Sequence, residues 1–87
     1  MAKAGKLLIV DDNRSILSAV KLLTESFFDQ VLTLPSPNTL ISTLQKSAPD
    51  VVLLDMNFHA GINTGNEGLY WLKEVLTKFP ETKVVLF

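Results

Sequence analysis

Residues 49–56 read PDVVLLDM, and a similar run at residues 7–12 reads LLIVDD. Both runs are apolar without alternation, are rich in branched aliphatic residues and end in aspartate. Runs of this kind are typical of parallel strands that are covered on both faces of a sheet. Residues 30–34 indicate a weaker strand, and residues 83–87 indicate a further one.

Helical patterns occupy the three stretches between these strands. A first helix is predicted after Asn13, which is suited to be its N-cap. Its apolar residues recur at helical spacing and predict one buried face: Ile16, Val20, Leu23 and Phe27. The first strand should therefore lead directly into an amphipathic helix.

The second and third helices have start and stop signals of their own. Ser36 followed by Pro37 predicts the start of the second, and Pro49 its end. Thr64 and Glu67 predict a capping box that opens the third, which ends at Pro80. The expected buried residues are Leu40, Ile41 and Leu44 on the second helix, and Leu69, Leu72, Val75 or Leu76, and Phe79 on the third.

The resulting order of elements, βαβαβαβ, predicts an α/β fold with an open parallel sheet. Crossovers between parallel strands are right-handed in nearly every protein. If the second and third strands flank the first, the strand order is 2-1-3-4. The first helix then covers one face of the sheet, and the second and third helices cover the other.

Composition narrows the class of protein. The chain has 87 residues, enough for one small domain, with 47% hydrophobic and 20% charged residues, as in globular proteins. The net charge of −1 and the lack of a basic run give no footprint for nucleic acid. There is no cysteine, which fits a reducing compartment, and the apolar run at residues 7–10 is too short to span a membrane. A cytoplasmic protein is expected.

Three aspartates follow two of the predicted strands. Asp11 and Asp12 come after the first strand, and Asp55 comes after the third. In open α/β sheets, ligands bind beyond the carboxyl ends of the strands, where the strand order reverses. Carboxylates gathered there repel one another, and a hard cation such as Mg²⁺ relieves that repulsion. A carboxylate beside the cation can then act as a nucleophile towards a phosphoryl group. The plainer alternative is that Asp12 and Asn13 only cap the following helix.

The chain resembles bacterial response-regulator receiver domains, which have a flavodoxin-like fold. The resemblance rests on residues 7–13 (LLIVDDN), 49–56 (PDVVLLDM), Gly68-Leu69 and 83–86 (KVVL). It implies that Asp55 accepts a phosphoryl group from a sensor histidine kinase. It also implies that Mg²⁺ is bound by Asp12 directly, by Asp11 through water, by Asp55 and by the backbone carbonyl of Asn57. Such a domain is a signalling module, not an enzyme acting on a separate substrate.

Two departures from the family pattern refine the expectation. Phe58-His59 stands where many members have Met-Pro, and the long stretch 59–68 resembles receivers of the nitrogen-regulator (sigma-54-dependent activator) type. In that type an ATPase and a DNA-binding domain follow the receiver, so the output would be transcriptional. The chain stops at Phe87, before the hydroxyl residue and lysine of the family. Residues 1–87 are therefore expected to be an incomplete receiver that lacks its fifth strand and last two helices, and a homodimer remains open.

The rival function is a Mg²⁺-dependent phosphatase of the haloacid-dehalogenase type, which also forms an aspartyl phosphate. Such an enzyme needs a second aspartate two residues after the nucleophile as a general acid. Asn57 occupies that place here and favours the receiver. A receiver that only mediates contacts would not need all three aspartates. His59 in the loop is more often solvated than functional, and Tyr70 and Trp71 are expected at a packing boundary.

Overall fold

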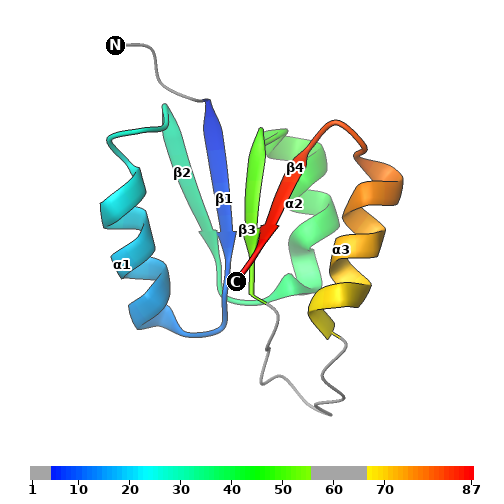
Figure 1. The fold of residues 1–87 in the computed structure, drawn as a ribbon, viewed down its shortest axis with the longest axis horizontal. Coiled ribbons are helices and arrows are strands. Elements are labelled where there is room, and N and C mark those ends of the chain that lie inside the picture. The colour runs from blue at the N-terminus through cyan, green and yellow to red at the C-terminus, as the bar shows by residue number, and fades with distance from the viewer. Residues whose placement is uncertain (1–4, 56–66) are drawn as a thin grey trace.

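A computed structural model describes residues 5–55 and 67–87 of the chain. Its four strands are parallel and form one sheet in the order β2-β1-β3-β4 (Figure 1). The strands are β1 (Lys6–Val10), β2 (Gln30–Leu34), β3 (Val51–Leu54) and β4 (Lys83–Leu86). The predicted fold class and strand order are confirmed.

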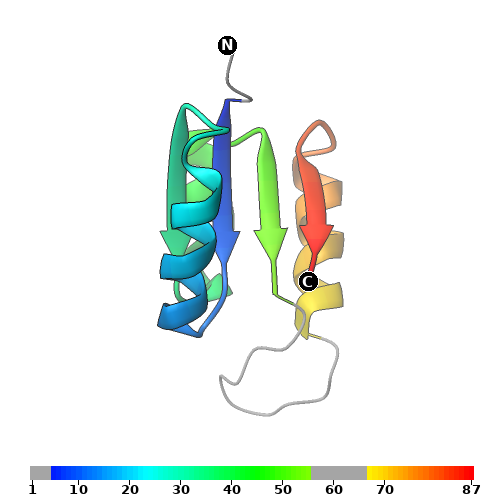
Figure 2. The same ribbon diagram turned by 60° about the vertical axis from the view of Figure 1, so that its left-hand side comes forward.

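Helices cover both faces of this sheet. They are α1 (Arg14–Thr24), α2 (Leu40–Ser47), which follows the short 3₁₀ turn η1 (Pro37–Thr39), and α3 (Glu67–Lys78). Figures 1 and 2 show α1 on one face and α2 with α3 on the other, as predicted. Among the described residues, no helix is long and apolar enough to cross a membrane.

The strand residues alternate between two hydrophobic clusters. Leu8 and Val10 of β1 face α2 and α3, whereas Leu7 and Ile9 face α1. All four are at most 1% exposed. Since both faces of β1 are covered, its sequence is continuously apolar instead of alternating with polar residues.

The first helix begins at its predicted cap, whereas α2 begins at Leu40, later than predicted, because Ser36 and Pro37 open the 3₁₀ turn η1 instead. Asn13 Oδ1 accepts hydrogen bonds from the backbone N–H groups of Ser15 (2.9 Å) and Ile16 (3.2 Å), which would otherwise lack a partner at the start of α1. Ser36 Oγ accepts one from Asn38 N–H at 3.2 Å, and Pro37 follows it in η1. The capping box expected at the third helix involves Thr64, which lies outside the described residues.

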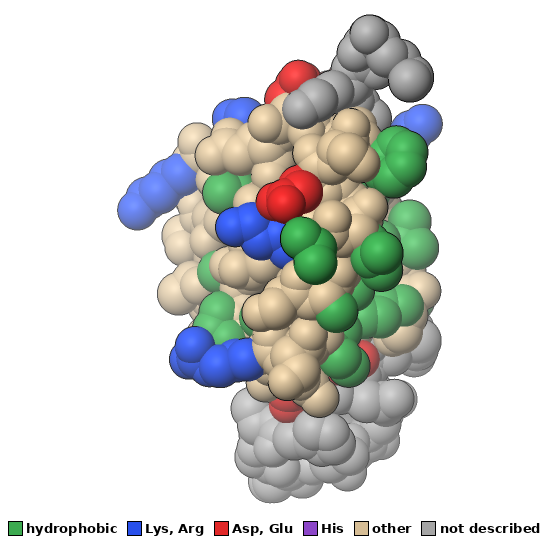
Figure 3. Space-filling model, turned by 90° about the vertical axis from the view of Figure 1, so that its left-hand side faces the viewer, with side chains coloured by type: hydrophobic (Ala, Val, Ile, Leu, Met, Phe, Trp, Pro, Cys, Tyr) green, Lys and Arg blue, Asp and Glu red, His purple; other side chains and the backbone are tan. Residues whose placement is uncertain are grey.

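The predicted buried face of α1 is wrong in part. Leu17 is the residue of α1 that is buried, at 6% exposed, with Val20 packed beside it. The side chains of Ile16, Leu23 and Phe27 are 39%, 71% and 66% exposed, and α1 ends before Phe27. The helix packs Leu17 and Val20 against the sheet. The neighbouring row of apolar residues, which includes Leu23, therefore lies on the side of the helix and not against the sheet. Figure 3, which looks onto this side, shows hydrophobic side chains at the surface.

On α3 the structure resolves the alternative that the sequence left open. Val75 is fully buried against the sheet, whereas Leu76 is 48% exposed. The helix ends at Lys78, two residues before Pro80, as the proline predicted. A short connection, residues 79–82, then leads from the end of α3 to the start of β4.

Candidate functional site

The strand ladder itself positions the candidate site. Val10 and Leu54 are register partners at the ends of β1 and β3. Asp55 N–H donates to the carbonyl of Val10 at 2.9 Å, and Asp11 N–H donates to that of Leu34 at 3.1 Å. These bonds continue the sheet by one residue and fix the backbone of both aspartates at the carboxyl edge of the strands (Figure 1).

The side chains of Asp11, Asp12 and Asp55 converge at this edge. Each offers one carboxylate oxygen, and these oxygens all lie within 4.8 Å of one another. Asp11 is 2% exposed and Asp55 is 9% exposed, whereas Asp12 is half-buried. Asn57, the fourth residue expected at the site, lies outside the described residues.

The electrostatics of the cluster are seen most clearly at Asp11. Burial raises the pKa of its carboxyl group above the usual value of 3.8, and the negative charges of Asp55 and Asp12 raise it further. The backbone N–H of Asn13 opposes this shift by donating to Asp11 Oδ1 at 2.9 Å. The fold thus holds the Asp11 carboxyl group where its ionisation is less favourable than in water.

The sequence also allowed the plainer reading that Asp12 and Asn13 only cap the following helix. The N-cap of α1 is Asn13. Asn13 caps α1 through its own side chain, as described above. The hydrogen bond from Asn13 N–H to Asp11 is an Asx turn, which the sequence reasoning did not anticipate. The signal for it was present, because aspartate commonly accepts from the backbone two residues further on. Asp11 therefore also shapes the loop that carries Asp12.

The donor set suits a hard divalent cation. It offers only carboxylate oxygens, which Mg²⁺ and Ca²⁺ prefer, and it gathers them from two separate strand ends. The negative charges of Asp12 and Asp55 contribute to the raised pKa of Asp11, and a bound cation would offset this repulsion between the carboxylates. The residues present fit such an ion.

Fold and site together define an open parallel α/β domain with an acidic cluster at the point where the strand order reverses. The family described as "Response regulator receiver domain" matches residues 7–87 of this chain. The chain belongs to that family.

Solved structures agree with this assignment. The N-terminal signal receiver domain of a two-component response regulator from Bacteroides fragilis is 48% identical, with a TM-score of 0.82 over 95% of this chain. A response regulator from Thermotoga maritima (25%, TM-score 0.76, 94% of this chain) and a chemotaxis protein from Vibrio cholerae (25%, 0.78, 98%) are also similar. The chain covers 64%, 64% and 68% of these three structures, respectively. No curated protein matches it.

Proposed function

We propose that this chain is a phosphoacceptor signalling module that takes a phosphoryl group on Asp55 from a sensor histidine kinase. The observation that carries the proposal is the convergence of Asp11, Asp12 and Asp55 within 4.8 Å at the strand ends. Membership of the receiver family supports it. Asp55 is the nucleophile in this proposal because it follows β3 and matches the acceptor position of the family.

The chemical step is a transfer between two nucleophiles. A carboxylate oxygen of Asp55 attacks the phosphorus, a P–O bond forms, and the P–N bond to the imidazole of the kinase breaks with its electron pair left on nitrogen. The ladder bond from Asp55 N–H to Val10 holds the backbone of the attacking residue during this exchange. Mg²⁺, held by Asp11, Asp12, Asp55 and the carbonyl of Asn57, would neutralise the charge of the phosphoryl oxygens.

Phosphorylation by a small-molecule donor tests the acceptor. The chain is incubated with acetyl phosphate and Mg²⁺, and its intact mass is measured. We expect wild type to gain one phosphoryl group and Asp55→Asn to gain none. Asp29→Asn is the matched control, since the Asp29 carboxylate is exposed and lies away from the cluster. Equal labelling of wild type and Asp55→Asn would show that the acceptor lies elsewhere.

The two metal-binding roles can be separated by calorimetry with Mg²⁺. We expect Asp12→Ala to lose more than the roughly 10–100-fold in affinity that is typical when a supporting residue around a metal is removed. Asp11→Ala should stay within that range, because its proposed contact is through water. A larger loss from Asp11→Ala would reverse the two assignments.

The output of the module is proposed to be transcriptional. The resemblance of residues 59–68 to nitrogen-regulator receivers supports a partner ATPase and a DNA-binding domain in the whole protein. The haloacid-dehalogenase alternative has no support from the family match or from the solved structures. The two differ in turnover: a phosphatase would hydrolyse p-nitrophenyl phosphate repeatedly, whereas we expect no sustained hydrolysis by this chain.

A further inference from the structure

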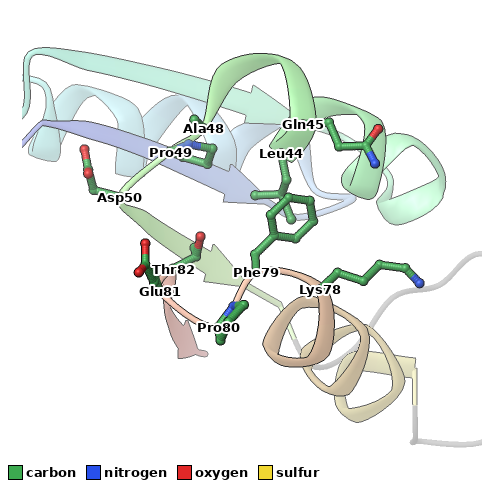
Figure 4. A pocket seen from close by; sticks show the side chains of 10 residues that line it. All are labelled: Leu44, Gln45, Ala48, Pro49, Asp50, Lys78, Phe79, Pro80, Glu81 and Thr82. Carbon is green, nitrogen blue, oxygen red and sulfur yellow. The ribbon is translucent and has the colours of Figure 1, made fainter.

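A groove lies at the amino end of the sheet, opposite to the acidic cluster. Its volume is about 550 Å³, within the roughly 300–1,000 Å³ typical of ligand sites. It is formed where α2 and α3 end and where β3 and β4 are about to begin (Figure 4). Nothing in the proposed phosphoryl transfer uses this groove.

The middle of the groove is apolar. Leu44 and Pro49 are buried there, and Phe79 is half-buried and packs against the cluster that contains Leu44. Figure 4 shows the Phe79 ring beneath Leu44. A partly exposed aromatic ring on a buried aliphatic base can accept one bulky apolar side chain, since covering it removes apolar surface from water.

The ends of the groove differ in charge. Asp50 and Glu81 lie toward one end and Lys78 toward the other (Figure 4). The ammonium group of Lys78 is already paired with Glu74 at 3.2 Å, whereas the Glu81 carboxylate has no ion pair within the described part of the chain. Asp50 Oδ2 already accepts a hydrogen bond from Lys6 N–H at 2.8 Å, so Glu81 is the carboxylate at this end with charge left to satisfy.

The helix ends add to this negative field. The last carbonyl groups of a helix carry partial negative charge, and both α2 and α3 end at the groove. Beside the groove, one cation already lies at the end of α2, because Lys6 Nζ donates to the carbonyl of Ser47 at 2.9 Å. The electrostatics of the groove favour a positively charged group.

The backbone beside the groove has an uncommon conformation. Ala48 ends α2 with φ 48° and ψ 57°, in the left-handed region that glycine usually occupies at such a position. Residues kept in this region at a cost in free energy often cluster at sites of binding. Here the left-handed residue turns the chain into Pro49 and so forms one wall of the groove.

We propose that this groove binds a segment of a partner protein in which an arginine or lysine stands beside a bulky apolar residue. The apolar side chain would cover Phe79, and the cation would approach Glu81 and Asp50. A partner protein fits better than a small molecule, because of the lining residues only Leu44 and Pro49 are buried, so a small ligand would stay largely in water.

The proposed partner would not compete with the phosphoryl group. Asp50 and Asp55 lie at opposite ends of β3, about 16 Å apart for five residues of extended chain. A partner could therefore bind to the phosphorylated and unphosphorylated chain alike. This inference does not rest on the proposed role of Asp55.

The test is a titration of the ¹⁵N-labelled chain with a capped tetrapeptide, acetyl-Gly-Arg-Phe-Gly-amide, followed by amide chemical shifts. We expect saturable shifts at Ala48, Phe79 and Thr82. Glu81→Gln should weaken the apparent affinity about three-fold, the scale of one exposed ion pair. Glu25→Gln is the matched control, because this exposed glutamate follows α1 and does not line the groove.

Three results would overturn the proposal. The first is the absence of shifts at the lining residues at millimolar peptide. The second is unchanged affinity in Glu81→Gln, or equal affinity for a peptide with glutamate in place of arginine. The third is binding of argininamide as tight as that of the tetrapeptide, which would assign the groove to a small organic cation. Repeating the titration with Asp55→Asn keeps this outcome separate from that of the phosphorylation experiment.

Discussion

The two ends of the sheet use aspartate in opposite ways. At the carboxyl end, Asp11 lies against Asp12 and Asp55, and its pKa is raised by burial and by their charges. At the amino end, Asp50 Oδ2 accepts a hydrogen bond from Lys6 N–H at 2.8 Å. The first arrangement opposes folding by gathering like charges, whereas the second joins β1 to the start of β3. The cost or benefit of an aspartate is therefore set by its neighbours.

The largest effect that would test this contrast is expected at Gly5. Its φ is +91°, and a Cβ there would overlap the Asp50 carboxylate. We expect Gly5→Ala to reduce the free energy of unfolding by about 2 kcal/mol, from the positive φ and the overlap with the Asp50 carboxylate together. At ~4–8 °C per kcal/mol, thermal melting should show a fall of about 8–16 °C.

A double mutant separates backbone strain from overlap. In an Asp50→Ala background the substitution Gly5→Ala should cost less, because the carboxylate that it would meet is gone. Equal costs in the two backgrounds would mean that the close approach of Gly5 to Asp50 has no energetic weight.

The next largest effect concerns Asp50 itself. Asp50→Ala removes the acceptor for Lys6 N–H, and we expect a loss of about 1 kcal/mol, as for a typical exposed hydrogen bond. Urea unfolding would measure it. Asp29→Ala is the control, expected within about 0.5 kcal/mol of wild type because its carboxylate is exposed and makes no hydrogen bond or ion pair in the described residues. Equal losses would show that the bond at Asp50 does not stabilise the sheet.

Ala48→Gly is expected to act in the opposite direction. Relief of the left-handed conformation is worth about 1–2 kcal/mol, and the extra freedom of glycine in the unfolded chain costs roughly 0.5–1 kcal/mol. A net gain of about 0.5 kcal/mol should appear as a higher midpoint in urea. Ala19→Gly, at an exposed position inside α1, should lose about 1 kcal/mol instead. A loss at both positions would mean that Ala48 is not strained.

The strands and the topology could be predicted because the sequence contains strong local signals. Residues 7–10 and 51–54 are continuous apolar runs, and Asn13, Pro49 and Pro80 mark helix ends. The convergence of the aspartates then follows from strand order alone. These features need no knowledge of side-chain packing.

Features that depend on packing could not be predicted. Leu17 and Leu23 lie on neighbouring apolar rows of α1, and helical spacing alone cannot tell which row faces the sheet. The orientation of α1 over β1 and β2 decides this. The Lys6–Asp50 hydrogen bond joins residues 44 positions apart, and the groove is assembled from two separate segments, 44–50 and 78–82. No local pattern specifies either of them.

The most direct test of the carboxyl end is the pH dependence of stability at Asp11. Because its folded pKa is raised above 3.8, the folded protein binds more protons than the unfolded chain between the two values. Stability therefore falls as pH rises from below 3.8 through the folded pKa, and it stays lowered above that value.

The variant Asp11→Asn tests this dependence, because an asparagine side chain at position 11 keeps an acceptor for Asn13 N–H but carries no charge. We thus expect Asp11→Asn, without divalent cations, to melt at a higher temperature than wild type at pH 7. At pH 3 the two should melt together, and Mg²⁺ at pH 7 should raise the Tm of wild type more than that of the variant. If Asp11→Asn were less stable than wild type at pH 7 in the presence of a chelator, the charge of Asp11 would not lower the stability of the folded protein.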